Sequence, residues 1–305
     1  MSNQADIIKK ANSENLSDIK VNYKKTNQFH ETIIRLRKNK GAMIGLAFLI
    51  LLVLTAISAD FLYDYQAEVI QQSIKDRLLW PSMEHPFGTD EYGRDLLARV
   101  VHGSRVSLIV AATAVTIALF VGGALGAAAG YYGKTIDNII MRCTDIVLSI
   151  PMTMFAIVIV AALGASTVNL ILALAVASVP IFARIVRGAV LTVRDKEFIE
   201  AARAIGAKDS TIILRHIIPN CLAPIIVQVT LRMSSAIYNT AALSFLGMGV
   251  SPPAPEWGAL LASGRNYIRD YSYLCVIPGF IIMLTILSLN MLGDGLRDAL
   301  DPRLR

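Results

Sequence analysis

Three consecutive residues, Gly133, Lys134 and Thr135, end like a phosphate-binding loop. That loop has the pattern G-x-x-x-x-G-K-[ST], in which backbone amides and the lysine hold nucleotide phosphates. The pattern requires glycine at position 128, and this sequence has Ala128. The segment also follows a long apolar run and not a strand. We therefore expect a turn with an interfacial lysine, and any ATP that the protein uses to be bound by another chain.

Side chains for acid-base, nucleophilic or metal chemistry are scattered. The four histidines are far apart in the sequence: His30, His85, His102 and His216. The three cysteines form no C-x-x-C pair, and there is no H-E-x-x-H or G-x-S-x-G motif. His85 and Asp90 could ligate a metal, but a hydrogen-bonded turn in which Thr89 or Asp90 caps the next helix is favoured. We expect no catalytic centre, cofactor or metal site.

Arg232 is the ionisable residue that falls inside a predicted membrane helix. Such residues usually mark a substrate path, because burying a charge in a bilayer is costly. Arg232 could line a polar path or attract a substrate carboxylate. It could equally be a structural residue that pairs with backbone carbonyls or a neighbouring subunit. With Asn239 and Thr240 further along the same stretch, it completes the set of candidate translocation-path residues.

Apolar runs dominate the elements that would position these residues. The chain has 305 residues, of which 54% are hydrophobic and 17% charged. A bilayer core of about 30 Å needs about 20 apolar residues of helix. The runs without a charged residue are 41–59, 106–133, 146–183, 233–255 and 271–293. The third run has 38 residues with a turn signal at 164–167, so it predicts two helices. The sequence predicts an all-α integral membrane protein with six transmembrane helices.

The distribution of Lys and Arg predicts the orientation of these spans. Alternate loops and the termini hold 21 of these residues on one side, against 7 on the other. Positive loops are retained in the cytoplasm, so both termini should be cytoplasmic. The net charge of +6 is then explained by basic residues beside the membrane, and we expect no nucleic acid partner. We expect a mobile cytoplasmic tail at 1–28, an amphipathic helix in the inner leaflet at 29–40, and the six-span domain at 41–305.

Small residues and prolines indicate how the spans pack. Gly122, Gly126 and Gly130 form a stripe at four-residue spacing, which favours close contact with another helix, although glycines can also be merely tolerated there. Pro151 and Pro180 are expected to kink the third and fourth spans.

Residues 194–219, called the hairpin below, predict two short helices outside the membrane. Lys196 to Ile205 is rich in helix formers, Gly206 provides a left-handed end, and Asp209 or Ser210 can cap a second helix. The first helix carries a narrow apolar strip beside charged residues: Phe198, Ala201, Ala202 and Ile205. Such a strip suits docking into a groove on a soluble partner, or equally covers the underside of the bundle.

The hairpin contains Glu200, Ala201, Ala202 and Gly206, followed after nine residues by His216 and Pro219. This resembles the EAA signature of permease subunits of bacterial ATP-binding-cassette importers. Four further segments resemble the C-type permease of dipeptide, oligopeptide and nickel importers: residues 37–40, 85–95, 243–247 and 293–303. The resemblance covers residues 29–305 and departs from the family at Thr240, where an acidic residue is frequent.

The resemblance implies a multi-pass subunit of the bacterial cell (inner) membrane that is not itself an enzyme. It would work with a homologous second permease, two cytoplasmic ATP-binding subunits and an extracellular solute-binding protein. The residues that would couple it to an ATPase are Phe198, Glu200, Ala201, Ala202, Ile205, Gly206 and Ala207. The solute would be a di- or oligopeptide, or alternatively nickel or a metallophore. A self-sufficient secondary carrier is the rival reading, and a membrane hydrolase is disfavoured.

Overall fold

The computed structural model describes residues 28–300, so the tail predicted at 1–28 lies outside the described residues except for Gln28. The described part is helical and contains no strand. Its elements are α2 (Gln28–Lys38), α3 (Lys40–Leu62), η1 (Tyr65–Ile70), η2 (Ile74–Asp76), α4 (Leu96–Tyr132), α5 (Lys134–Leu148), α6 (Met152–Leu163), α7 (Thr167–Leu191), α8 (Glu197–Ala204), α9 (Asp209–Thr211), η3 (Ile212–Ile217), η4 (Ile218–Cys221), α10 (Leu222–Phe245), α11 (Trp257–Gly264), η5 (Arg265–Tyr267) and α12 (Tyr273–Leu300).

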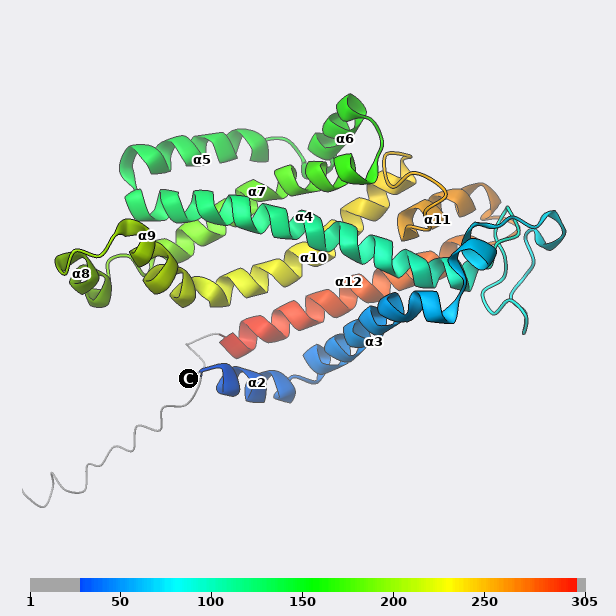
Figure 1. Cartoon of the computed structure of the whole chain (residues 1–305), viewed down its shortest axis with the longest axis horizontal. Helices are drawn as coiled ribbons and strands as arrows, with labels where there is room; N and C mark the ends of the chain where they lie inside the picture. Colours follow the sequence, from blue (N-terminus) through cyan, green and yellow to red (C-terminus); the bar gives the residue numbers. More distant parts are fainter. Residues whose placement is uncertain (1–27, 301–305) are drawn as a thin grey trace, which may run out of the picture.

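Long apolar helices run along the bundle from one end to the other (Figure 1). Five helical runs in the described residues are long and apolar enough to cross a membrane: α3, α4, α7, residues 209–245 and α12. The start of α2 and the end of α12 lie at the same end of the bundle as α8 and α9, which we call the hairpin end. The opposite end, with residues 63–95 and 246–272, is called the loop end.

The third predicted span differs from the continuous, kinked helix that the sequence favoured. α5 and α6 are separate helices that meet at an angle of 84°. Residues 149–151 between them, called the elbow below, end with Pro151, which lacks an amide hydrogen and cannot continue a helix at this point. The turn predicted at 164–167 is confirmed, because Ser166 caps α7 through its side chain. The described residues therefore hold five candidate spans, or six if the bent pair counts as one.

The glycine stripe of α4 packs against α7. A methyl group added at Gly122 would meet the carbonyl oxygen of Val179 and would lie 2.8 Å from the Cβ of Phe182. A methyl group at Gly126 would collide with the carbonyl oxygen of Ala183. Gly130 faces Val190 in the same way, at 2.8 Å. The prediction that this face contacts another helix is confirmed, and the stripe sets a closely packed seam along both helices.

Polar contacts close the loop end. Asp90 is 4% exposed, and its carboxylate accepts hydrogen bonds from the backbone and the guanidinium of Arg94 and lies 3.3 Å from Arg99. The buried Glu256 carboxylate accepts bonds from the backbone amides of Gly258 and Ala259 and from Ser107. The bond from Ser107 joins α4 to the distant loop that contains Glu256, so this loop is fixed on the bundle.

The cap of α4 corrects the sequence prediction. Asp95, and neither Thr89 nor Asp90, caps the helix, because its carboxylate accepts a 2.8 Å hydrogen bond from the Ala98 amide. Its second oxygen pairs with His85 Nδ1 at 2.8 Å. Thr89 instead accepts a hydrogen bond from the Leu79 amide. The segment is therefore a hydrogen-bonded turn, and the described residues contain no group of three possible metal ligands.

Candidate functional site

The first arm of the hairpin is α8, and it ends as the sequence predicted. Gly206 has φ +78°, the left-handed conformation that a side chain disfavours. The Gly206 amide donates to the Arg203 carbonyl at 2.9 Å, and the Ala207 amide donates to the Ala202 carbonyl at 3.1 Å. This pair of bonds is the Schellman motif, which satisfies the last carbonyls of a helix. The chain therefore leaves α8 in a fixed direction.

The apolar strip of α8 is divided between two faces. Ala202 is buried, together with Ile199, which the predicted strip did not include. Phe198 remains 43% exposed and Ile205 85% exposed, and Ala201 is exposed as well. One face of α8 thus covers the bundle, as one alternative predicted, and the other presents apolar side chains to the outside, where docking on a partner stays a prediction. Glu200 and Gly206 lie exposed, and Ala207 is half-buried.

An apolar cluster attaches the hairpin to three helices of the bundle. Its buried members come from the ends of α4 and α7, from the hairpin and from the start of α10: Ala127, Tyr131, Val186, Val190, Val193, Ile199, Ala202, Ile212, Ile217, Cys221 and Ile225. One polar contact adds to it, because the Tyr131 hydroxyl donates to the Asp209 carboxylate at 2.7 Å. The Arg203 guanidinium lies 5.2 Å from the centre of the Tyr131 ring. A displacement of the hairpin would therefore also move the side chains of α4, α7 and α10 that pack against it.

The second arm of the hairpin differs from the prediction at its cap, and it is continuous with α10. Lys208 occupies the cap position and α9 begins at Asp209, whose side chain bonds to Tyr131 instead of capping a helix. From Asp209 the chain stays helical through a π turn, η3, and a 3-10 turn, η4, into α10. The whole run, Asp209–Phe245, has 37 residues. The second arm of the hairpin is thus the first part of the helical run that carries the candidate path residues.

The three candidate path residues differ in their surroundings on α10. Arg232 is half-buried, and its Nε has no hydrogen-bond partner among the described residues. Thr240 is fully buried, with an unpartnered hydroxyl. Asn239 is 6% exposed and its side-chain amide donates to the Ser235 carbonyl at 2.7 Å. The structure brings them onto one helix but leaves Arg232 two turns from the other two.

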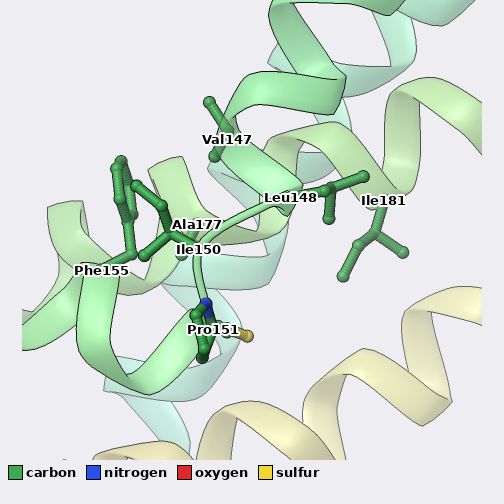
Figure 2. A pocket seen from close by; sticks show the side chains of 8 residues that line it. Val147, Leu148, Ile150, Pro151, Phe155, Ala177 and Ile181 are labelled. Atoms are coloured by element: carbon green, nitrogen blue, oxygen red, sulfur yellow. The ribbon is translucent and has the colours of Figure 1, made fainter.

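Beside Asn239 lies an apolar pocket beneath the elbow (Figure 2). Met152 connects the two, because its sulfur lies 3.8 Å from Asn239 Nδ2. The pocket encloses about 140 Å³. Its lining comes from α5, the elbow, α6 and α7: Val147, Leu148, Ile150, Pro151, Met152, Phe155, Ala177 and Ile181. A kink at Pro151 was predicted from the sequence, but no sequence signal indicated a cavity.

Several residues that build the site were not predicted. Tyr131 and Arg203 hold the hairpin against α4, and Ile199 anchors α8. Ile199 follows the apolar Phe198 in sequence, so the hydrophobicity pattern alone did not decide which of the two faces inward. Gly133 and Lys134, which resemble the end of a phosphate loop, form the junction between α4 and α5, with both φ angles positive.

Two family models match the chain. Residues 122–305 match the binding-protein-dependent transport system inner membrane component, and residues 27–81 match the N-terminal membrane domain of oligopeptide transport permease C. Among similar proteins is a dipeptide transport system permease of Alkalihalophilus pseudofirmus, 47% identical over 93% of this chain and 92% of the relative. A di/tripeptide transport system permease of Pseudomonas aeruginosa is 43% identical over 88% and 89%.

A third relative is the glutathione transport system permease of Escherichia coli, 44% identical over 91% of each chain. Among solved structures, the MetNI methionine ABC transporter in an inward facing conformation superposes with a TM-score of 0.54 at 18% identity, over 67% of this chain and 96% of that chain. The latter likeness concerns the fold. The chain therefore belongs to the family of binding-protein-dependent transport system inner membrane components, as a C-type permease of the dipeptide and oligopeptide ABC transporters.

Proposed function

We propose that this permease imports di- or oligopeptides across the bacterial inner membrane as one half of a heteromeric channel. A permease of this family is not itself catalytic, so the energy would come from two separate ATP-binding subunits. A homologous second permease would complete the path, and an extracellular binding protein would deliver the peptide. The peptide class rests on the relatives, which are permeases for dipeptides, tripeptides and glutathione.

The observation that carries this proposal is the division of α8 into two faces. Its buried face is tied to α4, α7 and α10, and its outer face leaves Phe198 and Ile205 exposed. Apolar side chains on a protruding helix fit a groove on another protein. An ATPase that closes would push on this face, and the helical run from Asp209 would carry the push to Arg232, Asn239 and Thr240.

The orientation belongs to the same proposal. With six spans, both termini and the hairpin would be cytoplasmic, and residues 63–95 would face outward. Cysteines placed at Gln72 and Lys208, both exposed, would be labelled with an impermeant reagent in intact cells and in lysed cells. Labelling of Gln72→Cys in intact cells and of Lys208→Cys only after lysis is expected. Both positions reacting from the same side would overturn the six-span model.

The coupling role is tested at Gly206 and Glu200. Gly206→Val forces a side chain into a left-handed conformation, which costs about 1 kcal/mol or more. Glu200→Lys reverses an exposed charge on the docking face. Both variants should insert at normal levels but lose peptide uptake, with fewer ATPase subunits co-purifying or with ATP hydrolysis that no longer responds to the loaded binding protein.

Gly188→Val is the matched control, because a side chain at Gly188 also meets nothing within 4 Å, yet its φ is not positive. Normal uptake by the Gly206 and Glu200 variants would reduce the hairpin to a passive cover. Uptake by the permease expressed without any ATPase would favour the secondary carrier instead.

A further inference from the structure

The elbow between α5 and α6 places irregular backbone at the depth of the membrane. The pocket beneath it is lined by Ala177 and Ile181, which flank Pro180 near the middle of α7. On the other side, Met152 contacts Asn239 within α10. Since α7 and α10 both belong to candidate spans, we infer that the elbow, which packs beside them, lies at the depth of the bilayer and not at its surface.

Backbone groups at the elbow are left unpaired. The carbonyls of Leu148, Ser149 and Ile150 accept no hydrogen bond from any described residue. The first amides of α6 have no partner either, because Pro151, at the cap position, provides no side-chain acceptor. Ser149, Ile150 and Pro151 are all exposed on the surface of the chain.

Lipid cannot cover such a segment. Hydrocarbon offers no hydrogen bonds, so non-helical backbone at membrane depth occurs only where protein buries it or where it lines a water-filled cavity. A polar side chain next to the pocket favours the second case, because the Asn239 amide contacts Met152 of the pocket lining. In transporters, interrupted membrane helices place free backbone groups where the solute passes.

The pocket itself has the size of one apolar side chain. It encloses about 140 Å³ between apolar residues, and an apolar cavity of about 150 Å³ in another protein takes a benzene ring. In Figure 2, Val147 and Leu148 at the end of α5, Phe155 of α6 and Ile181 of α7 surround the segment that leads to Pro151. Free carbonyls and amides lie directly beside this apolar space. A peptide with a hydrophobic side chain has the complementary groups: backbone donors and acceptors next to an apolar side chain.

We propose that the elbow lines the aqueous translocation path and that the pocket beneath it receives an apolar side chain of the passing peptide. This inference rests on the proposed function and adds a surface to the predicted path residues. Of these, Asn239 would lie at the pocket, whereas Arg232 would lie nearer the hairpin end of the same helix.

Thiol accessibility tests the first half of the proposal. Ile150→Cys is compared with Leu51→Cys, which lies 59% exposed in the middle of the unbroken helix α3, on the far side of the bundle. Both are made in the complete transporter, in a background with Cys143, Cys221 and Cys275 replaced by alanine. A charged, membrane-impermeant thiol reagent should modify Ile150→Cys at least tenfold faster, and transported peptide should slow the reaction. Equal rates at the two positions would overturn the proposal.

A pocket-filling substitution tests the second half. Ala177→Leu should slow uptake of Leu-Leu several-fold more than uptake of Gly-Gly, because the larger side chain takes the space of the passing one. Ala162→Leu, on the exposed surface of α6 and outside the pocket, should slow neither dipeptide. If Ala177→Leu slows both dipeptides equally, the pocket does not receive side chains, whatever the labelling shows.

The uptake and labelling measurements distinguish a failure of the proposed function from a failure of the proposal about the elbow. A wild-type assembly that takes up neither dipeptide would contradict the proposed function, while the labelling rates would still report whether the elbow is wet. An assembly that transports both dipeptides but leaves Ile150→Cys unreactive would contradict only the inference about the elbow.

Discussion

The loop end of the bundle is closed by buried polar contacts, whereas the hairpin end is closed by apolar packing. The loop end contains four buried charged residues that bond within the chain: Asp90, Arg94, Arg99 and Glu256. At the hairpin end, the apolar cluster around Ile199 anchors the hairpin, and both apolar and charged side chains remain on its outer face. The polar groups of the loop end therefore bond to one another, whereas the hairpin end leaves Phe198 and Ile205 exposed, which is the surface that we propose for the ATPase.

The largest expected effect breaks the loop end. Asp90→Asn removes the negative charge between two buried guanidinium groups, and loss of one partner of a buried pair costs about 3 to 5 kcal/mol. The purified transporter should unfold at a clearly lower temperature, and less of it should accumulate in the membrane. Glu84→Gln, an exposed carboxylate in the same loop, is the control. Equal stability of the two variants would show that the buried charges do not hold this end.

A smaller effect is expected at the seam that joins the two ends. Gly126→Leu places a side chain against the Ala183 carbonyl, and overpacking of this kind costs about 1 to 3 kcal/mol. Gly123→Leu is made in the same helix but meets nothing within 4 Å, so it should be neutral. The thermal stability of the two variants separates packing from helix propensity. If both are equally stable, the seam tolerates more space than the structure indicates.

The smallest effect sharpens the description of the hairpin end. Tyr131→Phe removes the hydroxyl that bonds to Asp209 but keeps the ring beneath Arg203, and such a bond contributes about 1 kcal/mol. Transport should fall modestly, with membrane levels unchanged, if the hairpin depends mainly on apolar packing. Tyr132→Phe, whose exposed hydroxyl bonds to no described residue, serves as the control in the same uptake assay. Complete loss of uptake in Tyr131→Phe would make the polar contact, and not the cluster, the principal anchor.

The sequence predicted features that depend on residues close together in the chain. The positive φ of Gly206 follows from its place after a run of helix formers, and the glycine stripe of α4 follows from its four-residue spacing. Charge-free runs located the long helices, because a bilayer imposes their length directly. These signals are local, and no partner element needs to be known to interpret them.

Features that depend on distant partners were not predictable in the same way. Asp90 appeared free to cap a helix, but the structure uses it to neutralise Arg99, nine residues away, while Asp95 takes the cap. Asp209 is occupied by Tyr131 from a different helix. Pro151 predicted a kink. The size of the bend, 84°, and the cavity beneath it depend on how α6 packs on α7, which the sequence does not show.

The π turn in the second arm of the hairpin has a geometric consequence for the whole subunit. Each residue of an α-helix advances the chain by about 100° around its axis, and a π turn accommodates extra chain without ending the helix. The residues Ile212–Ile217 therefore set the rotational phase between the outer face of α8 and the face of α10 that carries Arg232 and Asn239. Removing one residue there would leave both surfaces intact but turn one relative to the other by about a quarter of a circle. The proposed docking surface and the proposed path residues would then each keep their own structure but would no longer be aligned with each other.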